Sequence, residues 1–503
     1  MAVTNYFGAA AALAIGWLVS LLLTPIVARL ATRLGAVDYP DGGRKSHPRP
    51  VPRAGGVAVA LAAIIAMALT MGLTTPSEDA ASTWLVRGLA PAVGVLLVVG
   101  LIDDFLSLTG IYKLIGQVLA VSVLVAAGAQ FDQISLFGVM LPLGDFRIPF
   151  TLFFCLGAIN AFNLIDGADG LASSIGAIVC TSLGVLTASR GDVPAALACF
   201  AVAGALVGFL RYNVPPAKVY LGDTGSMLIG LVVAAVAIEC SIKHHTAFVL
   251  SVPIAICAIP ILDAGAALVR RVTTGQSVFT PDRGHLHHAL VLRGWSVGLT
   301  VAFIAGLAAL TSFAALVSYF TNNDLYALAV TAGVFVMLAV ARVFGHTEAA
   351  LIASHSRSFV RGLVLRGASG DETERSVQLQ GKLKWQKIWT ALREAAPLYN
   401  VAGLTLQVSI PQLHESFYAT WKRNDSVATG DDLWRIALPL MLDEKPIGKL
   451  TLLGAAAGRQ ALADMQQMLD YLESLEAEIA DIVADEEPVG ERWVVAGATT
   501  AVG

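Results

Sequence analysis

The chain has 503 residues, of which 56% are hydrophobic and 14% are charged, and its mean hydropathy is +0.70. Soluble domains carry about 25% charged residues, so this composition excludes an ordinary water-soluble enzyme, and the abundance of apolar side chains excludes a disordered chain. A pI of 6.1 excludes a basic nucleic-acid binder, and no nucleic-acid partner is expected. The composition therefore predicts a polytopic membrane protein.

The charges divide the chain near Phe344. About 18 Lys and Arg and about 16 Asp and Glu residues precede this point, whereas about 15 and about 21 follow it. Residues 1–344 are accordingly predicted to form a membrane domain, and the acidic remainder to be soluble. The five cysteines lie in apolar runs of the first part, which is typical neither of a disulfide framework nor of a thiolate metal site.

Eleven segments are apolar enough to be interpreted as membrane-spanning helices, although the fourth and the seventh fall below the practical minimum of about 17 residues. No cleaved signal peptide is expected, because residues 1–5 carry no positive charge and the first apolar run is too long. The fold class expected is an all-α polytopic membrane protein with a C-terminal cytoplasmic α+β domain. The predicted spans are residues 9–30, 55–73, 85–102, 114–129, 149–165, 171–188, 195–210, 226–242, 247–264, 297–320 and 326–344.

Lys and Arg residues are concentrated in alternate loops. The poor set of loops carries Arg87, Arg147, Arg190 and Lys243, and by the positive-inside rule it lies outside. The N-terminus is then outside and the acidic C-terminal part is cytoplasmic. Residues 131–148, on the outer side, alternate in the manner of a small β-hairpin. The rich set carries Arg29, Arg33, Arg44, Lys45, Arg49, Arg53, Lys113, Arg211, Lys218, Arg270, Arg271, Arg283 and Arg293.

The unusual polar residues all fall on this predicted cytoplasmic side, at helix ends and in the loops that follow them. Taken singly, each group has a structural explanation. Asp103 and Asp104 could be a solvated helix end, Asn160 and Asn163 could bond a neighbouring helix, and Lys45 could serve only the positive-inside bias. The histidines of residues 285–288 could form a surface loop or a zinc site, although no cysteine accompanies them.

Taken together, the polar groups indicate a more specific chemistry. Clustered carboxylates repel one another unless a cation lies among them, and Mg²⁺ prefers one or two carboxylates together with substrate phosphates. Arg and Lys supply the complementary donors for phosphate oxygens. The pattern therefore predicts phosphoryl transfer at the membrane surface, with one lipid-borne partner.

Five motifs in residues 40–298 carry a resemblance to a known family. The chain resembles the polyprenyl-phosphate N-acetylhexosamine-1-phosphate transferases, the superfamily of WecA, TagO and MraY. The motifs are RKSHPRPVPRAGG (44–56), Asp103-Asp104 with KLIGQ (113–117), NAFNLIDGADGL (160–171), YLGDTGS (220–226), and ILDAGAALVRR followed by FTPDRGHLHH (261–288).

The resemblance implies transfer of a sugar 1-phosphate from a UDP-sugar to undecaprenyl phosphate in the bacterial plasma membrane, with release of UMP. This is the first membrane step of cell-surface polysaccharide synthesis. The segment DRGHLHH (282–288) resembles the WecA and TagO pattern and favours UDP-GlcNAc, whereas the MraY group, which handles MurNAc-pentapeptide, usually shows three adjacent histidines. Two other classes stay open on the residues alone: a secondary transporter, which would hold its carboxylates near the midplane of repeated halves, and a membrane receptor that signals through its C-terminal part.

The same resemblance implies roles for individual residues. Asp103 and Asp104 would be catalytic, at the lipid phosphate, and Asp223 with Asn163 would hold Mg²⁺, for which Mn²⁺ could substitute. A phosphate monoester is already mostly dianionic at pH 7, so direct in-line attack is favoured over a covalent aspartyl intermediate. The expected substrate-binding residues are Lys45, Lys113, Asn160, Asp166, Asp169, Arg270, Arg271, Arg283, His285, His287 and His288.

The C-terminal part is predicted to contain a linker (345–375), a soluble α+β domain (376–487) and a flexible tail (488–503). Residues 382–396 have the apolar spacing of an amphipathic helix, residues 404–410 alternate as a strand, and 434–442 with 449–453 are expected to form a hairpin. This order resembles a reduced GAF- or PAS-type sensor and favours a role in regulation or assembly.

The last predicted helix has an apolar seam with heptad spacing. The seam could pack on the sheet of its own domain, or it could form a parallel coiled coil that makes the protein a homodimer. Its residues are Met465, Met468, Leu472, Leu475, Ile479 and Ile482.

Overall fold

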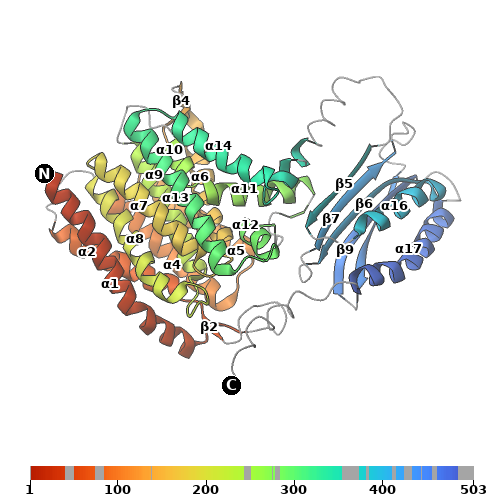
Figure 1. The fold of residues 1–503 in the computed structure, drawn as a ribbon, viewed down its shortest axis with the longest axis horizontal. Coiled ribbons are helices and arrows are strands. Elements are labelled where there is room, and N and C mark those ends of the chain that lie inside the picture. Colours follow the sequence, from red (N-terminus) through yellow and green to blue (C-terminus); the bar gives the residue numbers. More distant parts are fainter. Residues whose placement is uncertain are drawn as a thin grey trace, which may run out of the picture. The chain divides into compact units, whose positions relative to one another are not determined.

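A computed structural model shows two compact units (Figure 1). The first consists of Met1–Pro40, His47–Ala266 and His285–Phe344, and the second of Asp41–Ser46, Ala267–Gly284 and Gly345–Gly503. The structure describes residues 2–39, 50–73, 84–136, 139–242, 251–274, 276–277, 284–349, 351–353, 373–380, 384–410, 415–423, 433–442, 445–455 and 461–484.

The first unit is a bundle of helices with two small hairpins. The hairpin strands are β1 (Val37–Asp38) with β2 (Val51–Pro52), and β3 (Gln133–Leu136) with β4 (Val139–Pro142). The helices are α1 (Ala2–Leu34), α2 (Gly55–Leu73), η1 (Leu85–Leu89), α4 (Ala90–Leu106), α5 (Gly110–Ala126), η2 (Gly144–Phe146), α6 (Arg147–Ile165), α7 (Leu171–Ser189), α8 (Val193–Asn213), α9 (Gly222–Ile242), α10 (Ser251–Ile256), α12 (Leu286–Leu292), α13 (Val297–Thr321) and α14 (Leu325–Val340). Helix α11 (Ala258–Thr273) begins in the first unit, and its residues from Ala267 onward belong to the second.

Eight helices within the described ranges are long and apolar enough to cross a membrane, and two shorter apolar helices, α5 and α14, accompany them. These helices confirm the predicted membrane protein, but the predicted count of eleven is not reached. The predicted span 247–264 begins in residues outside the described ranges and is divided at Cys257 into α10 and α11. Pro260 lacks the N–H that a continuous helix would donate back to Ile256, which explains why no single helix forms there.

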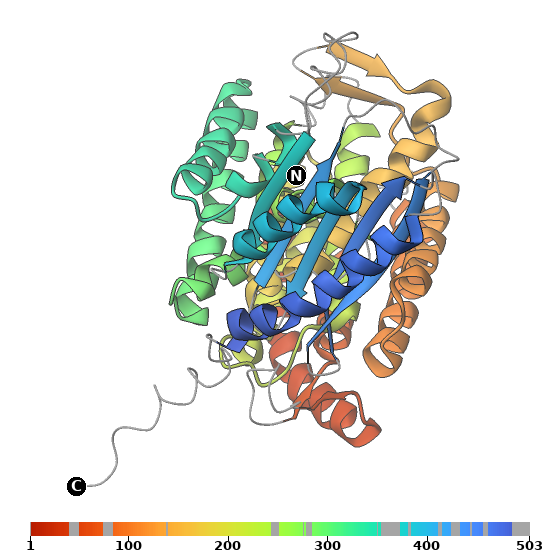
Figure 2. The ribbon, with the colours of Figure 1, turned by 90° about the vertical axis from the view of Figure 1, so that its right-hand side faces the viewer.

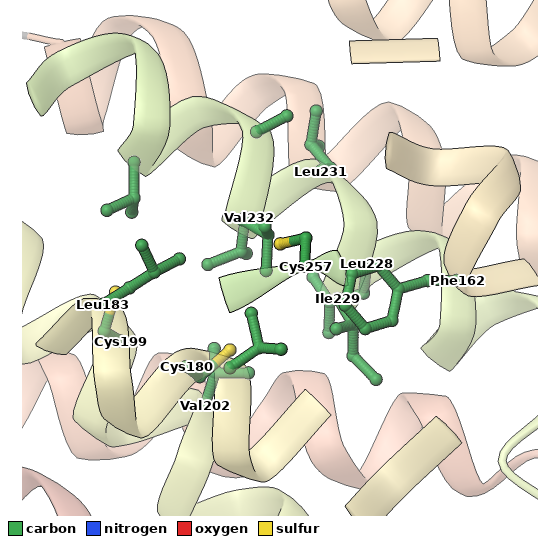
Figure 3. Close-up of a cluster of buried hydrophobic side chains, with 14 of the residues drawn as sticks. Phe162, Cys180, Leu183, Cys199, Val202, Leu228, Ile229, Leu231, Val232 and Cys257 are labelled. Atoms are coloured by element: carbon green, nitrogen blue, oxygen red, sulfur yellow. The ribbon is translucent and has the colours of Figure 1, made fainter. Parts of the chain in front are cut away.

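Helix α9 is the centre of the bundle. It packs against α2, α4, α6, α7 and α8, and nearly all of its apolar residues are buried. A Cβ at Gly230 would lie 2.5 Å from Cα of Ile159, so the small residue allows α6 and α9 to approach closely. Figure 3 shows Cys180, Cys199 and Cys257 among aliphatic side chains in this core, and all five cysteines are buried.

The hairpin predicted within residues 131–148 is confirmed. β3 and β4 pair antiparallel, with Leu136 opposite Val139. Phe131, which is buried, packs edge-on against Phe150 and Phe154 at centroid distances of 5.5 and 5.0 Å. These contacts fix the start of the hairpin to the first turns of α6.

The second unit contains a five-stranded antiparallel sheet of order β5-β7-β6-β9-β8. Figure 2 shows α16 and α17 on the same face of this sheet. The predicted amphipathic helix, strand and hairpin are confirmed by α16, β6, and the β8–β9 pair. The elements are β5 (Thr373–Gln380), α16 (Trp385–Ala395), η3 (Ala396–Tyr399), β6 (Val401–Ile410), β7 (Glu415–Lys422), β8 (Leu433–Leu442), β9 (Lys445–Ala455) and α17 (Ala461–Ala484).

The apolar seam of α17 lies against the core of its own unit. Met468, Leu475 and Ile479 are buried in one cluster with Trp385 and Trp389 of α16. The first of the two interpretations of the heptad spacing therefore accounts for the seam, and the coiled-coil interpretation loses the side chains on which it depended.

Candidate active site

Polar side chains gather at one end of the first unit, where α4 and α6 end and α5 and α9 begin. Asp103 and Asp104, in the last turn of α4, are only 3% and 8% exposed. Carboxylates buried beside apolar helices are costly unless they are paired. Each of the two has specific partners, and the partners differ.

Lys113 joins two of the predicted carboxylates. Its Nζ lies 2.6 Å from Oδ2 of Asp103 and also forms an ion pair with Oδ2 of Asp223. The three residues come from α4, α5 and α9, so this ammonium ties three helices together. Asp103 also accepts a hydrogen bond of 2.7 Å from the Leu108 N–H.

Asp223 has a further partner on α6. Nδ2 of Asn163 donates to Oδ1 of Asp223 at 2.8 Å and to Oγ of Ser226 at 3.1 Å. Within the described ranges, no three His, Cys, Asp or Glu side chains converge as a ready metal site. The donor set nevertheless suits Mg²⁺, because this ion is held by one or two carboxylates while substrate phosphates and water supply its other ligands.

Asp104 points at the first turn of α9. Its Oδ1 accepts from the Asp223 N–H at 3.0 Å, and its Oδ2 accepts from the Thr224 hydroxyl at 2.6 Å and from the Thr224 N–H at 3.4 Å. Both carboxylate oxygens are thus engaged within the protein.

Asn160 lies beside the cluster but pairs with another amide. Its Nδ2 donates to Oε1 of Gln117 at 2.8 Å and to the Leu156 carbonyl at 2.8 Å, and Nε2 of Gln117 returns a contact of 3.4 Å. This geometry joins α5 to α6. Substrate binding by Asn160 stays a prediction.

The loop between α6 and α7 carries Asp166 and Asp169. Burial, together with repulsion from Asp223, Asp104 and Asp169, raises the pKa of Asp166 well above its ordinary value. Asp169 accepts a hydrogen bond of 2.8 Å from the Ala217 N–H and thereby fixes the loop that precedes α9. Gly170 has φ +76° at the start of α7, a conformation that favours glycine.

The histidine segment lies against this loop. Asp263 accepts from the Leu286 N–H at 2.8 Å and pairs with Nδ1 of His285 at 2.9 Å. His287 is 3% exposed, and a Cβ at Gly167 would lie 2.7 Å from its Cε1 and Nε2 atoms. Neither ring nitrogen of His287 has a hydrogen-bond partner in the described part of the chain, and burial lowers its pKa to about 3. The ring of His288 lies 4.1 Å from that of His287.

The roles of four predicted site residues stay predictions. Lys45 and Arg283 lie outside the described residues. Arg270 and Arg271 belong to the second unit, where Arg270 forms a buried ion pair with Glu348.

Some polar contacts lay within the recognised motifs but were not anticipated. Thr224 and Ser226 stand in YLGDTGS, and Gln117 stands in KLIGQ. The described end of the first motif is also close, because the Gly56 N–H donates to the Leu221 carbonyl at 2.7 Å. Their position in a motif was the only signal in the sequence.

Comparison with known proteins identifies the family of the chain. Residues 86–241 match the profile of glycosyl transferase family 4, a segment that includes Asp103, Lys113, Asn163 and Asp223. A probable undecaprenyl-phosphate N-acetylglucosaminyl 1-phosphate transferase of Bacillus subtilis (strain 168) is 32% identical over 301 residues, which cover 59% of this chain and 81% of the relative.

The names of two further relatives include decaprenyl phosphate and undecaprenyl phosphate. A decaprenyl-phosphate N-acetylglucosaminephosphotransferase of Mycobacterium tuberculosis (strain ATCC 25618 / H37Rv) is 35% identical over 333 residues, with 61% of this chain and 81% of the relative covered. An undecaprenyl-phosphate alpha-N-acetylglucosaminyl 1-phosphate transferase of Escherichia coli (strain K12) is 28% identical over 315 residues, with 60% and 83% covered. The chain therefore belongs to the polyprenyl-phosphate N-acetylglucosamine-1-phosphate transferases of glycosyl transferase family 4.

Proposed function

We propose that the protein transfers N-acetylglucosamine 1-phosphate from UDP-GlcNAc to a polyprenyl phosphate and releases UMP. The observation that carries this proposal is the ammonium of Lys113 between Asp103 and Asp223 at the end of apolar helices. Such a site offers charge to phosphates while its surroundings suit a lipid chain. The names of the relatives support undecaprenyl or decaprenyl phosphate as the acceptor.

The reaction forms one P–O bond and breaks another. An oxygen of the lipid phosphate attacks the phosphorus that carries the sugar, and the bond from that phosphorus to the bridging oxygen breaks, so the oxygen leaves with UMP. Because the acceptor is already mostly dianionic at neutral pH, positioning and neutralisation of charge supply most of the rate. Lys113 and Asp103 are suited to the acceptor side of this step.

Asp223 and Asn163 would hold Mg²⁺, or Mn²⁺ in its place. When bound, this ion neutralises the diphosphate and the charge that develops on the leaving oxygen. Asn163 meanwhile orients the Asp223 carboxylate through its 2.8 Å hydrogen bond.

The donor end would lie between the α6–α7 loop and the histidine segment. Asp166 and Asp169 shape this loop, and the buried ring of His287, whose nitrogens have no partner in the described part of the chain, lies against it. Asp263 keeps His285 and the start of α12 in place. This end of the bundle would face the cytoplasm, where nucleotide sugars are found.

The second unit would serve regulation or assembly. Within it, Nε2 of Gln407, on β6, donates to the Thr274 carbonyl at the end of α11. Arg270 and Arg271 stand on the last turns of that helix. This hydrogen bond links the sheet of the second unit to the segment that carries the two arginines.

The proposal is tested with the purified full chain, UDP-GlcNAc, undecaprenyl or decaprenyl phosphate, and Mg²⁺. Release of UMP together with a lipid-linked GlcNAc diphosphate is expected, with little product from Asp223→Ala. If UDP-MurNAc-pentapeptide were the only donor that gave product, the enzyme would have the donor specificity of the MraY group. If no donor gave UMP and the wild type were as inactive as Asp223→Ala, the proposed enzymatic function would be refuted.

A further inference from the structure

We infer that the two adjacent aspartates do different work, and that Asp104 is a positioning residue that holds Asp223 through the first turn of α9. The inference rests on the proposed function and deepens it. It separates Asp104 from Asp103, although both were expected at the lipid phosphate.

The first turn of a helix has N–H groups without partners in the same helix. In α9, Asp104 accepts from two of them, those of Asp223 and Thr224, and also from the Thr224 hydroxyl. A carboxylate at this position caps the helix and is favoured by the helix dipole. Here the cap comes from α4, more than a hundred residues earlier in the chain.

Glycines allow this close approach. Gly222 has φ +73°, and a Cβ there would lie 2.3 Å from the Arg53 carbonyl oxygen and 2.7 Å from Oδ1 of Asp104. A Cβ at Gly100, one turn before Asp104, would lie 2.5 Å from Cα of Thr224. The start of α9 is therefore clamped directly on α4.

The contacts of Asp103 are of another kind. Its carboxylate pairs with the ammonium of Lys113, which Asp223 shares. The Asp223 side chain is 28% exposed, so it can meet a ligand, while its own N–H is held by Asp104. Both oxygens of Asp104 are already hydrogen-bonded, so Asp104 acts on the reaction through Asp223 and Thr224.

The test uses Thr224, because Thr224→Val removes the hydroxyl and keeps the shape, whereas Thr224→Ser keeps the hydroxyl. A hydrogen bond to a charged group corresponds to about a 10- to 100-fold effect. We expect Thr224→Val to lower kcat by that factor and to raise the Mg²⁺ concentration needed for half-maximal rate. Thr224→Ser should restore both. Thr300→Val, a buried threonine of α13 whose hydroxyl has no described partner, is the matched control.

A double-mutant cycle then identifies the partner of Thr224. The losses in the logarithm of kcat and in melting temperature should be less than additive for Asp104→Asn with Thr224→Val, because one contact is lost in either case. They should be additive for Asp103→Asn with Thr224→Val. Asp104→Asn should lower kcat and raise the Mg²⁺ concentration needed for half-maximal rate, as Thr224→Val does.

Three results would overturn the inference. These are a wild-type kcat and Mg²⁺ dependence in Thr224→Val, full additivity with Asp104→Asn, and a wild-type Mg²⁺ dependence in Asp104→Asn. If Asp104→Asn does not fold, the comparison of Thr224→Val with Thr224→Ser still decides. An active wild type with an unaffected Thr224→Val rejects only the inference. An inactive wild type rejects the proposed function, and the melting-temperature cycle still tests the contact.

Discussion

Removal of the ammonium between Asp103 and Asp223 should strongly reduce the rate of the transfer reaction. In Lys113→Met, the two carboxylates that share Nζ would face each other without a cation. Two oxygens bound to one ammonium lie about 5 Å apart, and at an effective dielectric constant of about 20 their repulsion is roughly 3 kcal/mol. Because about 1.4 kcal/mol corresponds to a factor of ten in rate, we expect kcat/KM for UMP release to fall by about two orders of magnitude.

The assay compares Lys113→Met with Arg33→Met, which removes an exposed basic residue of the last turn of α1. The control should keep the wild-type rate, and Lys113→Arg should recover part of the loss. High salt should change the ratio little, because the pair is partly buried and weakly screened. A Lys113→Met enzyme with the wild-type kcat/KM would show that this cation does not contribute to catalysis.

Three further predictions concern stability. Gly222→Ala should lower the melting temperature and the yield of folded protein, whereas Gly35→Ala, also at positive φ but with open space around it, should cost only about 1–2 kcal/mol; equal losses would contradict this. His287 has a pKa near 6.5 in the unfolded chain and about 3 in the folded chain, so the free energy of unfolding should fall by up to about 1.4 kcal/mol per pH unit below pH 6.5. Melting temperatures measured at several pH values check this prediction. The same pH dependence in His287→Gln would refute it. Met468→Ala should destabilise the second unit by about 2–5 kcal/mol, because it removes a buried side chain, and unfolding followed by tryptophan fluorescence measures this loss. Chemical cross-linking between chains should not change. Loss of a cross-linked dimer would instead favour the coiled coil.

Much of the fold was accessible from hydropathy, because a helix that crosses a membrane must be long and apolar. The failure at residues 247–264 has a clear cause. An average over that window registers the apolar side chains around Cys257 but not the missing N–H of Pro260, so two helices were taken as one. The seam of α17 failed as evidence for a dimer because heptad spacing is shared by any helix that packs along one face.

The candidate site was predictable as a set of residues but not as a set of contacts. Motif order indicated that Asp103, Lys113, Asn163 and Asp223 belong together. The division of partners between them depends on how α4, α5, α6 and α9 pack, which spacing along the chain does not encode. Thr224 shows this most directly, since its hydroxyl gains its meaning only from the carboxylate of another helix.

Helix geometry explains why the neighbouring aspartates have different hydrogen-bond donors. Successive side chains on an α-helix point about 100° apart, so Asp103 and Asp104, both in the last turn of α4, must face different surroundings. One direction leads to Lys113 and the other to the start of α9. A carboxylate buried next to hydrocarbon is tolerated only where hydrogen-bond donors or cations lie within its reach. Each aspartate meets that requirement with different donors, so the paired motif in the sequence corresponds to two separate tasks, one at the ammonium of Lys113 and one at the start of α9.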